Sequence, residues 1–407
     1  MKRRSFLKST AALAATPLLA SGSLHAASAQ GLSGDLTLWH GWTGAEADTL
    51  NNVILPAWTA ANPDAKVETL AVPFDQLKNK FSTDAASGGG PDLLVGPLDW
   101  VGELADGELI APLDEMATAE VTGAFIPAVV DALKFNDQLF GLPESFETVA
   151  LYYNKDLVPT PPTTTEEMKT MSAAMPEGVY GMALFSNFFH PAGYLFGFGG
   201  ELFDAENMSI INSPETVEFL NWIKQFTTEP GLFQQNDDAA ISSLFKEAKA
   251  AMVINGPWAL GDYTGALGED KVGVAPLPLI SEKADAAPMP FLGVKHIMMS
   301  SNIEGDQATL AFEFMKFFTG PESAGPLAES AGHLPANTAV DVSADPIAQA
   351  FITQGEHVTP MPSIPEMGQV WEPAGQMITT VLSGDATPEE AAASAQDTIN
   401  SAIENMA

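Results

Sequence analysis

Three kinds of residue in this sequence could support chemistry: carboxylates, adjacent tyrosines, and tryptophans placed just behind predicted strands. With 52 acidic residues, some pair of carboxylates could always serve as the acid and base of glycoside hydrolysis. Tyr152 and Tyr153 are neighbours, and phenolates can ligate iron. Trp258 stands three residues after the predicted strand Ala251–Asn255, behind a Gly-Pro break. Because ligands of an open α/β sheet lie beyond the carboxyl ends of its strands, Trp258 is placed to contact one.

Conventional catalytic and metal-binding motifs are missing from the chain. It has no G-x-S-x-G, no H-E-x-x-H and no glycine-rich loop that ends in G-K-[ST]. The histidines beyond the first thirty residues are far apart in sequence, so we expect no local zinc site. Without cysteine there is neither a disulfide nor a thiolate metal ligand. We therefore expect a binding protein without a cofactor, and not an enzyme.

The charge balance is strongly acidic, with 52 acidic residues against 17 basic ones. Beyond Gln30 the basic residues are 13 lysines, and no arginine remains. Nucleic acid and anionic membrane surfaces are bound through clusters of lysine or arginine, so we expect neither as a partner. Arginine is also the preferred residue for bidentate capture of carboxylate and phosphate. An anionic ligand is therefore not expected.

Residues 1–29 have the pattern of a cleavable export signal. A basic head precedes the apolar stretch Ala11–Ala20, and an Ala-Ser-Ala sequence ends at Ala29. The stretch is shorter than the ~20 apolar residues of a membrane span. Arg3–Lys8 (RRSFLK) resembles the twin-arginine export motif, and a general secretory signal is the alternative. We expect a soluble periplasmic protein, since no cysteine follows the signal for lipid attachment, and we expect it to be a monomer.

Short apolar strands alternate with amphipathic helices along the rest of the chain, which is typical of α/β folds. Leu36–Trp39 is a predicted strand, and apolar residues then recur at helical spacing from Leu50 to Ala61 until Asn62-Pro63 ends the helix. Ser213-Pro214 combines a capping hydroxyl with a proline and so predicts a second helix start. A further helix leads into the strand Ala251–Asn255. Two α/β lobes are expected.

Four segments have the order and spacing of segments in a known family. They are GGGPDLLVGPLDW (Gly88–Trp100), FGLPESFETVALYYNKDL (Phe140–Leu157), KAAMVINGPWAL (Lys249–Leu260) and MPSIPEMGQVWEPA (Met361–Ala374). The chain resembles the maltose/maltodextrin-binding proteins among the family 1 extracellular solute-binding proteins of ABC importers, over nearly all residues beyond the signal. This resemblance implies a type II periplasmic-binding-protein fold, with a ligand cleft between two α/β lobes joined by crossover strands.

The resemblance also implies where the lobes begin and end. The first lobe would contain residues 30–146 and 291–338, and the second would contain residues 147–290 and 339–407. The chain would cross between them near three segments: Pro143–Thr148, Phe291–Lys295 and His333–Thr338. Closure of the lobes would report to the transporter that ligand is bound.

The function implied by the resemblance is sugar transport. The protein would bind a neutral mono- or oligosaccharide, namely maltose, a malto-oligosaccharide or a related α-glucoside such as trehalose or sucrose. It would deliver this sugar to the permease subunits of an ABC transporter in the inner membrane. A polyamine-binding or ferric-ion-binding protein of the same fold and a secreted glycoside hydrolase are the alternatives.

Aromatic residues at the family's positions would supply surfaces for sugar rings, whose C–H faces pack on flat rings. Trp258 and Trp371 match family residues that stack on sugar, and Phe189 falls where the family has an aromatic residue. Trp42 stands where the family has polar residues that contact sugar, which implies a different sugar footprint. The remaining Trp58 and Trp222 lie on apolar helix faces and are expected in the core.

Two carboxylates keep the family's positions. Asp99 and Glu147 would accept hydrogen bonds from sugar hydroxyls, and such a bond to a charged group contributes ~1.5–3 kcal/mol. Two departures stand close to Asp99: Trp100 replaces the family's arginine, and Gly96 replaces its tryptophan. These departures leave the choice among the sugars open.

Overall fold

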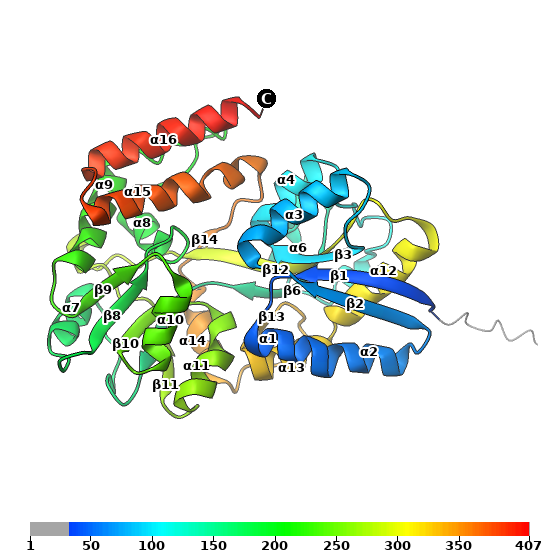
Figure 1. Cartoon of the computed structure of the whole chain (residues 1–407), viewed down its shortest axis with the longest axis horizontal. Coiled ribbons are helices and arrows are strands. Elements are labelled where there is room, and N and C mark those ends of the chain that lie inside the picture. The colour runs from blue at the N-terminus through cyan, green and yellow to red at the C-terminus, as the bar shows by residue number, and fades with distance from the viewer. Residues whose placement is uncertain (1–31, 407) are drawn as a thin grey trace, which may run out of the picture. The chain divides into compact units, whose positions relative to one another are not determined.

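Two β-sheets organise the protein (Figure 1), and the computed structural model describes residues 32–406. The predicted export signal lies outside the described residues. The first sheet has seven strands, of which six follow a continuous order and β14 pairs with β12. That order is β13 (Leu334–Pro335), β6 (Leu142–Glu147), β12 (Phe291–Met299), β3 (Leu93–Pro97), β1 (Gly34–His40) and β2 (Ala65–Ala71), with β14 at Thr359–Pro360.

The second sheet has five strands. Their order is β11 (Val272–Ala275), β7 (Ala150–Asn154), β10 (Ala250–Asn255), β8 (Tyr180–Phe185) and β9 (Leu232–Gln235). A separate hairpin pairs β4 (Lys134–Phe135) with β5 (Gln138–Leu139). Every strand of the second sheet comes from the middle of the chain, between two visits to the first sheet.

Helices cover both sheets, as expected of an α/β fold. Around the first sheet lie α1 (Gly44–Thr49), η1 (Leu50–Ile54), α2 (Leu55–Ala61), α3 (Phe74–Ala86), η2 (Leu98–Trp100), α4 (Val101–Asp106), α5 (Ala119–Thr122), α6 (Pro127–Ala132), α12 (Gly305–Phe318) and α13 (Pro321–Ala331). The other helices are α7 (Thr165–Ala173), α8 (Ala192–Phe198), α9 (Pro214–Ile223), η3 (Lys224–Thr227), α10 (Asp238–Lys246), η4 (Pro257–Ala259), α11 (Leu260–Leu267), η5 (Ser281–Lys283), α14 (Pro346–Gln354), η6 (Pro365–Gln369), α15 (Trp371–Ser383) and α16 (Pro388–Glu404). Within residues 32–406 no helix combines the length and the apolar character that a membrane crossing requires.

Two helix starts are capped by side chains, one of them at the predicted Ser213-Pro214. The hydroxyl of Ser213 accepts a hydrogen bond from the Thr216 backbone N–H, and Pro214 occupies the first turn of α9. Thr387 and Glu390 form a capping box at α16, with each side chain accepting from the other's backbone N–H. Such local signals need no tertiary contact to act, so they can be predicted from sequence alone.

The predicted core tryptophans are confirmed. Trp58 is buried, and its Nε1 donates a hydrogen bond of 3.1 Å to the Ala65 carbonyl oxygen. Trp222 is also buried, and it stacks on Tyr194 with ring centroids 4.2 Å apart. Both indoles therefore stabilise packing between elements and are unavailable to a ligand.

The carboxyl ends of three strands meet at one edge of the first sheet. Strand β1 pairs in parallel with both β2 and β3. Since parallel strands end at the same edge, the residues that follow His40, Ala71 and Pro97 are brought together there.

Strands β6 and β7 are successive in the chain, and they connect the first sheet to the second directly. β6 ends at Glu147 in the first sheet, and β7 begins at Ala150 in the second.

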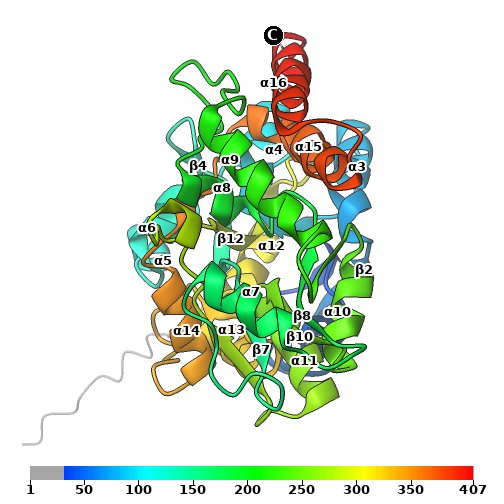
Figure 2. The ribbon, with the colours of Figure 1, turned by 90° about the vertical axis from the view of Figure 1, so that its left-hand side faces the viewer.

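Near the C-terminus, α15 and α16 lie side by side and both pack against α9 from the middle of the chain (Figure 2). Trp371 is the first residue of α15, so its position depends on packing between helices that are far apart in the sequence.

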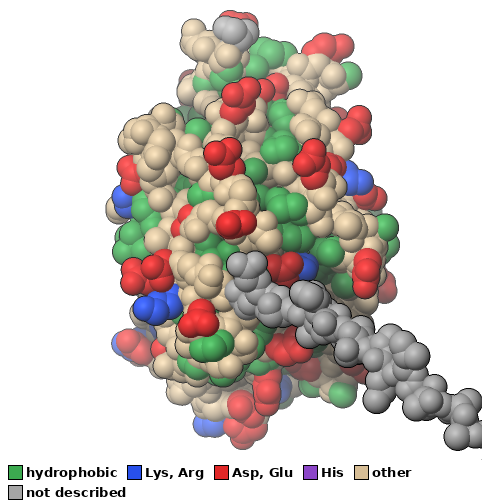
Figure 3. Space-filling model, turned by 90° about the vertical axis from the view of Figure 1, so that its right-hand side faces the viewer, with side chains coloured by type: hydrophobic (Ala, Val, Ile, Leu, Met, Phe, Trp, Pro, Cys, Tyr) green, Lys and Arg blue, Asp and Glu red, His purple; other side chains and the backbone are tan. Residues whose placement is uncertain are grey.

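Acidic side chains are spread over the surface. One face of the molecule carries many isolated Asp and Glu side chains and few lysines between them (Figure 3). Their spacing agrees with a composition of 52 acidic and 17 basic residues.

Candidate functional site

Trp258 stands directly over the carboxyl end of β10. The strand ends at Asn255, and Trp258 lies in the short helix η4 that follows. A side chain at Gly256 would overlap the Trp258 indole, so only glycine lets the ring fold back over this point. The Gly-Pro break therefore places a partly exposed indole at the strand end.

The ring of Phe189 lies close to the indoles of both Trp258 and Trp371. The centroid of the Phe189 ring lies 6.1 Å from that of Trp258 and 6.2 Å from that of Trp371. Phe291, the first residue of β12, stacks on Phe189 with centroids 6.1 Å apart and planes 16° apart. Phe291 is buried, whereas the other three rings are partly exposed. The structure thus brings three of the predicted aromatic residues into one cluster.

Asp99 is bonded to this cluster. It lies in η2, just after β3, and its Oδ2 accepts a hydrogen bond of 3.0 Å from Trp371 Nε1. Burial raises the pKa of Asp99 to about 6, while the positive charge of Lys78 and the bond from Trp371 act in the opposite direction. Asp99 therefore orients the Trp371 indole, a role that its position in the sequence did not predict.

Lys295 places a positive charge beside Glu147. Its Nζ lies 2.7 Å from Glu46 Oε1 and 3.7 Å from Glu147 Oε2. The same Nζ lies 5.8 Å from the ring centroid of Trp42 and 5.8 Å from that of Trp258. Burial disfavours the charge, but the carboxylates of Glu46 and Glu147 outweigh it and raise the pKa of Lys295. The ammonium is thus fixed between carboxylates and indole rings.

His333 extends this charge network. Its Nε2 lies 2.8 Å from Glu46 Oε1, and its Nδ1 lies 2.9 Å from Glu144 Oε2. Carboxylates only accept hydrogen bonds when ionised, so both ring nitrogens must carry a proton. Burial lowers the pKa of His333, yet Glu144 and the hydrogen bonds raise it to about 9. Burial likewise disfavours the Glu46 carboxylate, but Lys295 and His333 lower its pKa to about 2.

Trp42 lies beside this network, but its ring is only 5% exposed. It stacks on Phe318 with centroids 5.5 Å apart and meets the His333 ring edge-on at 5.5 Å. Packing on α12 therefore covers most of this indole, which we expected among the residues that contact the ligand. Its position near Lys295 is nevertheless at the carboxyl end of β1, as the sequence suggested.

Glu46, Glu144, Lys295 and His333 were not identified from the sequence. Glu46 and Lys295 are 249 positions apart, and Glu46 and His333 are 287 apart. One signal was available: Lys295 and His296 interrupt the apolar residues of the strand FLGVKHIMM, and a charge such as that of Lys295 in a largely buried strand requires a partner.

The adjacent tyrosines are not arranged as a pair of metal ligands. Successive strand residues point to opposite faces of a sheet. Tyr152 is buried, and its hydroxyl donates a hydrogen bond of 2.9 Å to the Gly256 carbonyl oxygen. Among residues 32–406, no group of three or more His, Asp and Glu side chains is placed to hold a metal ion.

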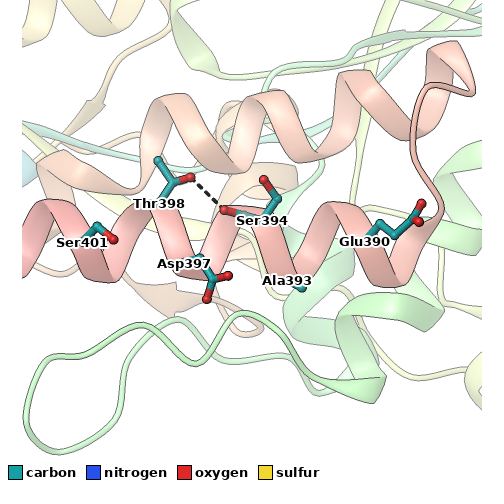
Figure 4. A pocket seen from close by; sticks show the side chains of 6 residues that line it. All are labelled: Glu390, Ala393, Ser394, Asp397, Thr398 and Ser401. Atoms are coloured by element: carbon teal, nitrogen blue, oxygen red, sulfur yellow. Dashed lines mark hydrogen bonds between the residues drawn. The ribbon is translucent and has the colours of Figure 1, made fainter.

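A hollow elsewhere on the surface offers no comparable chemistry. It runs along the outer side of α16 (Figure 4) and is lined by small or acidic side chains of that helix. The lining residues are Glu390, Ala393, Ser394, Asp397, Thr398 and Ser401. Without an aromatic surface or a basic group, this hollow does not match the predicted ligand.

Comparison with known proteins identifies one family. Residues 55–353 match the family described as bacterial extracellular solute-binding protein. A maltotriose-binding protein of Pyrococcus abyssi is 31% identical over 349 residues, covering 83% of this chain and 75% of the relative. A galactooligosaccharide-binding protein of Bacillus subtilis is 28% identical over 361 residues, covering 84% of this chain and 83% of the relative.

Solved structures of sugar-binding proteins are similar to this protein over most of its chain. The maltose/maltodextrin-binding domain MalE of Bdellovibrio bacteriovorus, bound to maltotriose, gives a TM-score of 0.85 at 26% identity over 91% of this chain and all of the other. The maltotriose-binding protein of Thermus thermophilus, with bound maltotriose, gives 0.83 at 28% identity over 90% of this chain and all of the other. The expected two-lobed periplasmic-binding-protein fold is confirmed.

Proposed function

Because the chain belongs to the bacterial extracellular solute-binding proteins, we propose that it captures a neutral α-glucoside for an ABC importer. The ligand class is maltose, malto-oligosaccharides or a related sugar such as trehalose or sucrose. The protein works as a soluble periplasmic monomer and passes the sugar to permease subunits in the inner membrane. The proposal is supported by relatives and structural neighbours whose names or bound ligands include maltotriose.

The observation that carries this proposal is the aromatic cluster of Trp258, Phe189 and Trp371 beside fixed polar groups. Partly exposed rings can pack on the C–H faces of pyranose rings. Asp99 and Glu147 provide acceptors for sugar hydroxyls, and the Lys295 ammonium is a donor. A neutral ligand suits this set, since a chain without arginine beyond residue 30 has little with which to bind an anion.

Trp42 belongs to the proposed site through Lys295. Both the Trp42 ring and the Trp258 ring lie 5.8 Å from Lys295 Nζ, so they flank the donor from two elements. In this proposal Trp42 shapes the site from one side, and its edge meets the ligand more than its face.

The lobe boundaries are also a proposal: residues 30–146 with 291–338, and residues 147–290 with 339–407. Most strands support them, because β6 and β12 belong to the first sheet and β7 and β10 to the second, whereas β14, within residues 339–407, pairs with β12 of the first sheet. Lys295, Glu144 and His333 then lie on the three crossing segments, so their charge network ties the hinge together.

Polyamine binding fits the site less well than sugar binding. A cationic ligand needs carboxylates that are free to receive it, but Lys295 already neutralises Glu46 and lies beside Glu147. Ferric binding lacks a tyrosine pair that faces one point, as described above. Hydrolysis would require Asp99 and Glu147 to act as acid and base, and the relatives that we find are binding proteins.

Calorimetric titration with maltose, maltotriose, trehalose and sucrose, with tryptophan fluorescence in parallel, tests the proposal. We expect micromolar affinity for at least one sugar together with a change in indole emission. If none of the four sugars binds, the sugar assignment is wrong, although membership of the family stands. A nitrophenyl glycoside serves as the check for hydrolysis, and we expect no turnover.

A further inference from the structure

Phe74 lies at the same sheet edge as Asp99 but plays no part in the site described above. It is the first residue of α3, which follows the carboxyl end of β2. Asp99 and Trp100 follow the carboxyl end of the parallel neighbour β3, on the other side of β1. The topology therefore places Phe74 next to residues that the proposed function already uses.

The Phe74 ring is unusually open to solvent. It is 59% exposed, the highest value among the exposed large hydrophobic residues within 32–406. Its ring stacks on Trp100, with centroids 5.4 Å apart and planes 29° apart, and Trp100 itself is only 5% exposed. Since Trp100 covers one face, the opposite face of Phe74 is the one available to a ligand.

Polar side chains stand next to this open ring. Asp75 and Gln76, the next two residues of α3, are both exposed. One turn further on, Lys78 Nζ lies 2.6 Å from Glu103 Oε2. Lys78 lies four residues after Phe74 on the same side of α3 and carries a partly buried ion pair, and Asp75 and Gln76 add exposed polar groups at the start of the helix.

We propose that Phe74 is an additional platform for a pyranose ring, so that the ligand is an oligosaccharide of three or more rings. This inference rests on the proposed sugar-binding function and specifies its substrate class. Trp258 and Trp371 would serve two rings. Asp99, which accepts the hydrogen bond from Trp371, is the chain neighbour of Trp100, on which Phe74 stacks. A disaccharide held by Trp258 and Trp371 would leave Phe74 uncovered, whereas a longer chain would reach it.

Titrations of the wild-type protein with maltose, maltotriose and maltotetraose, repeated with Phe74→Ala, test this inference. We expect wild-type affinity to increase from maltose to maltotriose. Phe74→Ala should weaken binding of maltotriose and maltotetraose at least fivefold and leave maltose within twofold. Phe74→Tyr keeps a flat ring and should retain wild-type affinity for all three sugars. Val53→Ala, which truncates a side chain 45% exposed on η1, is the control and should change nothing.

Two outcomes would overturn the inference without touching the proposed function. Equal weakening for all three sugars would mean that Phe74 acts by supporting Trp100. Unchanged affinities for every sugar would mean that the exposed ring serves another partner, such as the permease. Failure of the wild-type protein to bind any sugar would instead contradict the proposed function itself.

Discussion

Trp371 Nε1 donates a hydrogen bond of 3.0 Å to Asp99 Oδ2, and this bond links the start of α15 to the turn that follows β3. The two residues are 272 positions apart in the chain. Asp99 is buried, and burial makes ionisation at this position costly even though the bond from Trp371 favours the carboxylate. This bond thus fixes the Trp371 indole beside a buried carboxylate that is costly to ionise.

Replacing Asp99 by asparagine should stabilise the protein at neutral pH. Burial raises the folded-state pKa to about 6, above the ordinary value of 3.8, so the carboxylate costs stability once it ionises. The favourable contribution of the protonated form is complete below pH 3.8 and is lost as the pH rises through 6. Asparagine keeps an oxygen for Trp371 without the charge, and the gain should be on the order of 1–3 kcal/mol at pH 7 to 8.

Denaturant unfolding of both proteins from pH 4 to 8 measures this difference. The advantage of Asp99→Asn should shrink to nothing near pH 4. Glu68→Gln, a change of an exposed carboxylate on β2, is the control for general charge effects. An advantage that is constant over the whole pH range would show that the Asp99 carboxylate is not the titrating group.

Replacing Trp258 by alanine should weaken sugar binding at least tenfold, which corresponds to ~1.4 kcal/mol. The ring is partly exposed and stands over Gly256 outside the strand, so its removal should leave the fold intact. Calorimetric titration with the best-binding sugar measures the loss, and circular dichroism checks the fold. Trp258→Phe keeps an aromatic surface and should lie between the two. An alanine variant with wild-type affinity would exclude stacking on this indole.

The local parts of the fold were predictable because they depend on neighbouring residues. Caps at Ser213 and Thr387 and the end of the helix at Ala61 follow from residue types within one turn. The position of Trp258 behind its strand was predictable for the same reason. By contrast, the network that joins Glu46 to Lys295 and His333 depends on contacts across more than 200 residues, which spacing cannot reveal.

Gly96 and Trp100, the two departures from the family's pattern, are in contact in the structure. A side chain at Gly96 would place its Cβ 2.5 Å from Trp100 Cε3, so the Trp100 ring occupies the space over the strand end that a larger residue would need. The sequence showed both residues but not their contact. Likewise, the sequence could not show that the Trp42 ring stacks on Phe318, because this contact arises only when α12 packs on the sheet.

Thermal stability should increase with ionic strength. Beyond residue 30 the chain has 13 lysines against 52 acidic residues, and the acids are spread over the surface (Figure 3). Folding brings these like charges closer together, and salt screens their repulsion over the ~10 Å Debye length at 0.1 M. Calorimetric melting in 0.02 to 1 M sodium chloride, compared with equal osmolarity of a neutral solute, measures the effect. A flat profile would mean that surface repulsion contributes little to stability.

Stability should also fall as the pH rises from about 6.5 through 9, because His333 loses its proton. Glu144 and the hydrogen bonds raise its folded pKa to about 9 against the burial that lowers it, while Lys295 disfavours the charge. A raised folded pKa gives stability that is complete below the ordinary value of 6.5 and is lost as the pH passes 9. Above that pH, Glu46 and Glu144 share a buried site with the positive charge of Lys295 alone.

Replacement of His333 by glutamine removes this dependence while keeping a hydrogen-bond donor. The variant should be less stable than the wild type at pH 7 by about 3–5 kcal/mol, because breaking a buried ion pair leaves carboxylates uncompensated. Its unfolding free energy should then change less than that of the wild type between pH 7 and 9.5. His357→Gln, a change outside the network, is the matched control and should follow the wild-type profile. If the wild type and His333→Gln lose stability in parallel over this range, another group titrates and His333 is neutral in the folded protein.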